Sequence, residues 1–117
     1  MWVLAREFDA AIAALETAES LNPDDGKPAK VMGQLYLHWE QYQFAREALD
    51  RAAAVYASTE PEETHAEVNY LLAIAHINLK QYNAALVALD RMAGDSAYDT
   101  RGAALERFIA NRREMSR

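Results

Sequence analysis

Three histidines and a few paired carboxylates are the residues of this 117-residue chain that are best suited to chemistry. A metal site or a catalytic base would need His38, His65 or His76 beside a second ligand or an oriented partner, yet no two of them have the i, i+4 spacing of a helical ligand pair. The acidic pairs at 24–25 and 62–63 fall in expected turns or first helical turns, where negative charge favours the helix dipole. We expect structural or surface roles for all of these side chains, and no metal.

Other catalytic patterns are missing from the sequence. The absence of cysteine excludes disulfides, thiolate zinc sites and a cysteine nucleophile. There is no glycine-rich phosphate loop and no nucleophile with an oriented base. We therefore expect a protein that is not an enzyme and that carries no cofactor.

Composition narrows the class of protein further. A formal charge of −6 argues against binding to a phosphate backbone, and we interpret the five arginines after residue 100 as a solvated helix end rather than a nucleic-acid site. A chain of 117 residues, 51% of them hydrophobic, can bury a core as one domain. No apolar run approaches the ~18 residues of a membrane span, and no basic segment precedes an apolar run at the N-terminus. We expect a cytoplasmic protein with no membrane partner, if Met1 is the true start.

The spacing of apolar residues predicts an all-α chain. Helices are expected at 8–21, 28–39, 42–57, 61–79, 82–92 and 100–114. Thr59 and Glu62 have the spacing of a capping box and Pro61 suits a first turn, so the fourth helix should start there and be longer than the second. The last helix should bury Ala104, Leu105, Phe108 and Ile109.

One spacing recurs along the chain. Tyr42, Ala45, Leu49 and Ala52 repeat the types of residues 34 positions earlier, and Gln41-Tyr42, Ala45, Leu49 and Asp50-Arg51 recur 40 positions later. A period of this size with a helix-turn-helix inside it indicates a stacked helical array.

These residues resemble the tetratricopeptide repeat (TPR) family, whose pattern is W-x2-L-G-x2-Y, then A-x3-F, then P. The central unit matches with Met32, Gly33 and Tyr36, followed by Ala45, Leu49 and Ala52. The third unit places Leu72, Ala73 and His76, then Ala85 and Leu89, in the same register, and the first keeps Trp2, Ala11, Leu15, Ala18 and Pro23. The resemblance covers about residues 1–93.

The resemblance implies a right-handed α-α superhelix, a TPR-like solenoid of antiparallel helix pairs with a C-terminal capping helix. Within the single domain 1–117 it divides the chain into a partial repeat at 1–25, a repeat at 26–59, a repeat with an extended first helix at 60–94 and a capping helix at 95–117. Small residues at Gly33, Ala45, Ala73 and Ala85 should lie where paired helices cross.

The resemblance also implies a concave groove lined by the first helix of each hairpin. The partner-binding residues expected there are Lys27, Lys30, Gln34, Leu37, His38, Tyr70, Ile74, Ile77 and Asn78, with Glu67 beside them and Val3 and Leu4 at the edge. Tyr70, Ile74, Ile77 and Leu37 would anchor a peptide or amphipathic helix of another protein, and the polar residues would orient it. The apolar stripe has an alternative explanation, which is that the last helix or a second copy of the chain covers it.

Our expectation for function is a protein-interaction module, an adaptor or scaffold. One alternative is self-assembly, because Met1 falls inside a repeat unit, and the exposed flank of the next helix would then close a homodimer through Trp2, Val3, Leu4 and Ile12, unless a longer parent chain was cut here. A second alternative is a small chaperone similar in size and fold to those of type III secretion. The sequence does not identify the partner, the organism or the oligomeric state.

Overall fold

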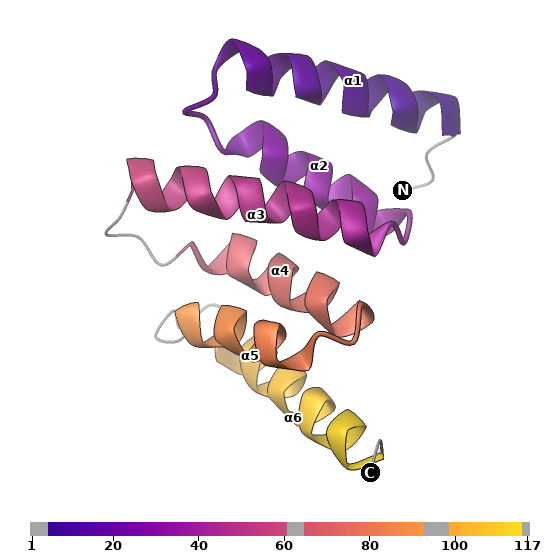
Figure 1. Ribbon diagram of the computed structural model, residues 1–117, viewed down its shortest axis with the longest axis vertical. Helices are drawn as coiled ribbons and strands as arrows, with labels where there is room; N and C mark the ends of the chain where they lie inside the picture. The colour runs from indigo at the N-terminus through magenta and orange to yellow at the C-terminus, as the bar shows by residue number, and fades with distance from the viewer. Residues whose placement is uncertain (1–4, 61–64, 93–98, 116–117) are drawn as a thin grey trace.

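The computed structural model describes residues 5–60, 65–92 and 99–115. Six helices lie in these ranges, and each runs antiparallel to the one before it (Figure 1). They follow one another through the molecule in chain order, which gives a slab with extents of 43 × 35 × 22 Å. The helices are α1 (Ala5–Leu21), α2 (Lys27–His38), α3 (Tyr42–Thr59), α4 (Ala66–Asn78), α5 (Tyr82–Arg91) and α6 (Asp99–Met115). The expected all-α class is confirmed.

Two hairpins, α2 with α3 and α4 with α5, are closed by the same turn. Glu40 and Lys80 take left-handed backbone angles, with φ of 58° and 61°. In the first turn the Glu40 N–H donates to the Leu37 carbonyl at 3.1 Å and the Gln41 N–H donates to the Tyr36 carbonyl at 2.8 Å, which is the Schellman closure of a helix. The second turn repeats both bonds, from Lys80 to Ile77 at 3.0 Å and from Gln81 to His76 at 2.8 Å. The 40-residue period of the sequence is therefore a period of backbone geometry.

The first hairpin is tight because Gly33 has no side chain. A Cβ added there would lie 2.4 Å from Cγ of Leu49 and 2.5 Å from its Cδ2, closer than atoms can approach. Leu49 is fully buried, and it packs directly on the backbone of α2. In the second hairpin, Ala73 and Ala85 are likewise fully buried. The predicted small residue at a helix crossing is confirmed at Gly33, whereas Ala73 and Ala85 are confirmed as buried and their place at a crossing stays a prediction.

The core continues from one hairpin to the next. Ala48, Leu49 and Ala52 on α3 and Val68 and Leu72 on α4 belong to one buried cluster. Helix α4 contacts α2, α3, α5 and α6, so most of its circumference is covered. The buried cluster also includes Ile12 of α1, Met92 after α5 and Ile109 of α6.

The connection between α3 and α4 differs from the prediction. Thr59 is the last residue of α3, and its hydroxyl donates to the Val55 carbonyl at 2.9 Å, so it does not cap the next helix. Helix α4 begins at Ala66 after His65, whose backbone is left-handed at φ 50°. The prediction of one long helix from residue 61 is therefore wrong, because α4 begins at Ala66. Residues 61–64 lie outside the described residues. The extra length is in α3, which has 18 residues against 13 in α4.

Helix α6 packs with a different stripe from the one expected. Gly102 and Ile109 are buried and Leu105 is half-buried, which follows an i, i+3, i+7 spacing toward α4 and α5. Ala104 and Phe108 are exposed instead. Gly102 lies against the flexible end of Met92, where an added Cβ would come within 2.8 Å of Cε.

Replacing Gly33 by leucine tests the hairpin crossing. The new side chain must displace Leu49 from a filled site, so the free energy of unfolding should fall by roughly 3 kcal/mol. Urea unfolding followed by circular dichroism measures the change. Gly102→Ala is the control, because its Cβ meets only the flexible end of Met92, and helix propensity should raise stability by roughly 0.5–1 kcal/mol. Equal effects of the two substitutions would contradict the tight crossing.

Candidate functional site

Helices α2 and α4 lie side by side and are joined by a polar bridge. Nζ of Lys30 lies 3.3 Å from Oε2 of Glu67, and Nε2 of Gln34 donates to Oε1 of Glu67 at 3.1 Å. Both carboxylate oxygens of Glu67 are thus used by the neighbouring helix. The fold thus brings together residues that lie 33 and 37 positions apart in the sequence and that were expected to share a groove.

The remaining predicted residues differ in how much surface they offer. Leu37, Tyr70 and Ile74 are half-buried. Leu37 and Tyr70 pack against the buried core cluster. Ile77 is 9% exposed and belongs to the core cluster, because α4 is enclosed by four helices. The exposed members are Lys27, Gln34, His38 and Asn78. We call the exposed and half-buried members on α2 and α4 the polar strip; they are Lys27, Lys30, Gln34, Leu37, His38, Tyr70, Ile74 and Asn78. Val3 and Leu4 of the expected edge lie outside the described residues.

The last helix reaches the end of this strip. The guanidinium of Arg101 on α6 lies over the ring of Tyr70, 5.8 Å from its centroid. Farther along α4, the side-chain amide of Asn78 donates to the Ile74 carbonyl at 2.9 Å. The chain therefore covers its own apolar stripe in part, at Tyr70, and the strip is more polar than the sequence indicates.

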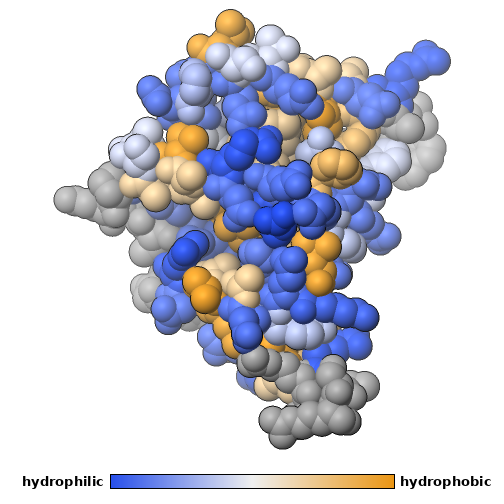
Figure 2. All heavy atoms as spheres, viewed as in Figure 1, coloured by the Kyte–Doolittle hydropathy of each residue, from blue (hydrophilic) through white to orange (hydrophobic). Residues whose placement is uncertain are grey.

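The most exposed large apolar side chains of the described residues lie elsewhere. They belong to α1, α3, α5 and α6 and are Leu21 (81% exposed), Phe44 (52%), Val87 (51%) and Phe108 (40%). In space-filling view, polar side chains cover much of the visible face and apolar ones form small separate patches (Figure 2). The apolar surface is thus divided among the helices and is not concentrated on α2 and α4.

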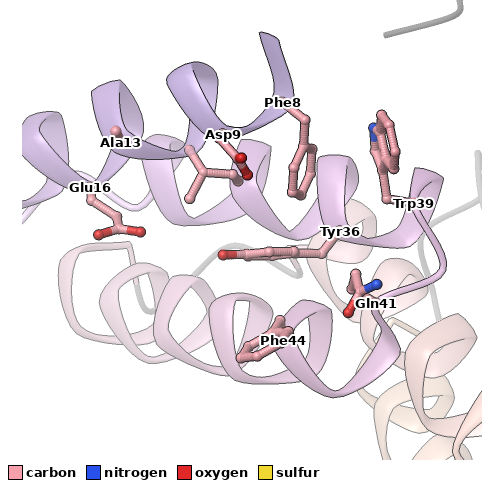
Figure 3. Close-up of a pocket in the computed structure, with 9 residues that line it drawn as sticks. Phe8, Asp9, Ala13, Glu16, Tyr36, Trp39, Gln41 and Phe44 are labelled. Atoms are coloured by element: carbon pink, nitrogen blue, oxygen red, sulfur yellow. The ribbon is translucent and has the colours of Figure 1, made fainter. Parts of the chain in front are cut away.

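Three helices line an open pocket that sequence reasoning missed. It has a volume of about 320 Å³ and lies among α1, α2 and α3. Figure 3 shows Tyr36 lying between α1 and α3, with Phe8 pointing down from α1 and Trp39 beyond it. Its lining residues are Phe8, Asp9, Ile12, Ala13, Glu16, Tyr36, Trp39, Gln41 and Phe44. We call it the aromatic pocket.

The rings of this pocket form one connected cluster. Phe8 meets Tyr36 edge-on, with centroids 5.6 Å apart and planes at 73°, and lies 5.1 Å from Trp39. Tyr36 lies 5.5 Å from Phe44. Such separations are those of favourable aromatic pairs. Nε1 of Trp39 is buried without a hydrogen-bond acceptor among the described residues, so the indole is held by ring contacts.

Negative charge faces these rings from α1. Asp9 and Glu16 line the pocket, and their carboxylates point from α1 toward Tyr36 (Figure 3). Burial raises the pKa of the Tyr36 phenol above its ordinary 10.0, and the charges of Glu16, Asp9 and Glu47 raise it further, whereas Arg51 lowers it. Arg51 is itself bound, with Nε 3.1 Å from Oε2 of Glu19. The net field at the phenol is negative.

The pocket gave little signal in the sequence. Phe8, Tyr36 and Trp39 fit the apolar stripes of their own helices, and Asp9 and Glu16 look like ordinary solvent-facing residues of an amphipathic helix. Only the packing of α1 on α2 brings the acids over the rings. An i, i+7 pair of acids that flanks the apolar stripe of α1 was the one available sign.

Two of the three histidines, His65 and His76, make local structural contacts. His65 stacks on Tyr56 with centroids 5.1 Å apart, and its Nε2 lies 2.7 Å from the Glu60 carbonyl oxygen. Nδ1 of His76 lies 2.8 Å from Oε1 of Gln81, across the second turn. Within the part of the chain that the structure describes, no three His, Asp or Glu side chains gather as a metal ion requires. None of the described helices combines the length and apolar content that a membrane crossing needs.

Comparison with known proteins adds no relative. The chain matches no protein-family model, and a search of curated proteins also finds no match.

The phenol of Tyr36 provides a measurable test of the pocket's field. Tyrosinate absorbance of the native chain minus that of Tyr36→Phe should titrate above pH 10, because burial and the facing carboxylates disfavour the phenolate. Because folding raises the pKa of this phenol, its environment in the fold contributes to stability only while the phenol is neutral. That contribution is fully present below pH 10 and is lost as the pH rises through the pKa of the folded state. Glu16→Gln should lower the midpoint. A midpoint at or below 10 would contradict the described environment.

Proposed function

We propose that this chain is a protein-binding module of the tetratricopeptide type, a right-handed superhelical stack whose polar strip takes a segment of another protein. The observation that carries the proposal is the bridge from Lys30 and Gln34 to Glu67, since it holds the first helices of successive hairpins in one surface. The identical hairpin turns at Glu40 and Lys80 support a true structural repeat.

The partner segment would be held mainly by polar contacts. Lys27, Gln34 and His38 are exposed on α2, and Asn78 is exposed at the end of α4. Leu37 and Ile74 are half-buried and would supply the apolar contact between them. This favours an extended peptide, whose backbone needs donors and acceptors, over a helix with a wide apolar face. A role as an adaptor or scaffold follows from such binding, and the cytoplasmic location expected from the sequence stays a prediction.

Site-specific crosslinking tests the strip. A photoreactive amino acid at Gln34 should capture a partner protein in cells that express the chain, whereas the same group at the exposed Gln43 of α3 should not. With the captured protein purified, Lys27→Glu with His38→Glu should weaken binding at least about tenfold, because it reverses the charge of Lys27 and adds a negative charge at His38, at the two ends of α2. Calorimetry measures the affinity.

The matched control is Arg91→Glu with Gln43→Glu. It changes the formal charge by the same amount at exposed positions of α5 and α3, and it should leave the affinity within about twofold. Equal loss in both double variants would mean that net charge, and not the strip, controls binding. Capture at Gln43 but not at Gln34 would overturn the proposal.

Self-assembly is the second candidate function, and one observation favours it. Leu21, at the end of α1, is 81% exposed, which is the largest value among the large apolar side chains described. Of the edge residues expected to form a dimer, Ile12 is 7% exposed and contributes to the core, and Trp2, Val3 and Leu4 lie outside the described residues. A chaperone role like that of the type III secretion proteins would use the same polar strip.

Mass in solution separates the two candidates. If α1 closes a homodimer, light scattering at tens of micromolar should give twice the mass of 13.1 kDa, and Leu21→Glu should return the monomer, because a charge in an apolar contact is costly. A monomer at all concentrations removes self-assembly and leaves the strip as the interaction surface.

A further inference from the structure

The aromatic pocket combines two features that suit a cation. The faces and edges of four rings line it, and the carboxylates of Asp9 and Glu16 stand on the α1 side. No lysine or arginine is among its lining residues. Aromatic faces attract cations through the ring quadrupole, and carboxylates add charge-assisted hydrogen bonds. Electrostatically the pocket is therefore prepared for a positive group that its own lining does not supply.

The repeat itself shows which positive group fits beside such a carboxylate. Moving 34 positions along the chain places Arg46 at the position of Ile12 and Asp50 at that of Glu16. In α3 these two residues form an ion pair, with Nη1 of Arg46 3.1 Å from Oδ2 of Asp50. In α1 the same position holds Ile12, so Glu16 has no guanidinium four positions before it on its own helix.

The aromatic lining is also special to the first gap between hairpins. Forty positions later the three rings contributed by α2 and α3 are all replaced by smaller or non-aromatic side chains. The replacements are His76 for Tyr36, Leu79 for Trp39 and Ala84 for Phe44. The gap whose helix carries Arg46 keeps one of the four Phe, Tyr or Trp rings, with Tyr42 at the position of Phe8, whereas the gap that has all four rings lacks the arginine.

We propose that the aromatic pocket binds the guanidinium group of an arginine side chain from another protein. A guanidinium is planar and weakly hydrated, so it stacks on rings at low desolvation cost and still donates to carboxylates in pairs. A volume of about 320 Å³ lies at the small end of the roughly 300–1,000 Å³ range of ligand pockets, which suits one side chain. This site goes beyond the polar strip and uses different side chains.

The charges around the pocket are consistent with this ligand. Glu47 on α3 adds a third negative charge felt at Tyr36, and Arg51 is the cation that opposes them. Arg51 is held by Glu19 at 3.1 Å and does not line the pocket. With a formal net charge of −6, the chain as a whole also attracts basic partners.

Fluorescence of Trp39 can report the binding. In a Trp2→Phe background Trp39 is the single tryptophan, and it lines the pocket. The probes are the capped tripeptide Gly-Arg-Gly, the same peptide with citrulline or lysine in place of arginine, methylguanidinium and tetramethylammonium. The arginine peptide should give a saturable change and bind about tenfold or more tighter than the citrulline peptide, which has the same shape without charge. Lysine and tetramethylammonium should bind more weakly than arginine and methylguanidinium.

Exposed residues allow variants that preserve the fold, which circular dichroism checks. Glu16→Gln should weaken the arginine peptide about tenfold, since it removes a charge-assisted bond. Phe44→Ala should weaken it about threefold, through loss of one ring face. Glu7→Gln is the matched control, because it makes the same change at another exposed position of α1 that does not line the pocket, and it should have no effect.

Several results would overturn the proposal. Equal binding of the arginine and citrulline peptides would show that charge is irrelevant, and no saturable change would show that the pocket is closed to ligands. Tetramethylammonium or lysine binding as tightly as arginine would refute a guanidinium site. Saturable binding of methylguanidinium but not of the arginine peptide would refute an arginine side chain as the ligand. Equal effects of Glu16→Gln and Glu7→Gln would refute the position of the site.

Discussion

The contact between Gly33 and Leu49 is the constraint on which the first hairpin depends. A buried leucine that lies against bare backbone sets how close α2 and α3 approach, and every residue on their outer sides takes its position from that separation. In the second hairpin, Ala73 and Ala85 are likewise fully buried. Because the turns at Glu40 and Lys80 share their geometry, the two hairpins present corresponding residues to their neighbours.

Stacking of the hairpins decides which surfaces remain available. Helix α4 is contacted by four other helices, so its apolar residues are largely used for packing and its open surface is short. Glu67 at the start of α4 is committed to Lys30 and Gln34 of α2. What remains for a partner on these two helices is mainly polar. Specificity there would come from hydrogen-bond geometry and charge more than from buried area.

A different surface arises where α1 rests on α2 without closing fully on α3. The side chains around that gap are large and aromatic, and the acids of α1 face them. The second gap differs chemically at the corresponding positions, where histidine, leucine and alanine stand in place of tyrosine, tryptophan and phenylalanine. A repeat protein can thus hold its backbone nearly constant and vary function through the residues between helices, since packing at the crossings does not depend on them.

The sequence by itself determined the number and order of the helices, the turns near residues 40 and 80 and the small residues at the crossings, because helical periodicity and residue size are local properties. The start of α4 was predicted wrongly from Thr59, because a threonine hydroxyl can donate backward to a carbonyl of its own helix, here that of Val55, as readily as it can cap the next helix. The buried face of α6 depended on how this helix packs on α4 and α5, which its own sequence does not specify. Only the tertiary structure decided that Ile77 is buried and that Asp9 and Glu16 face Tyr36, because burial and electrostatic fields arise from the angle and distance at which separate helices pack.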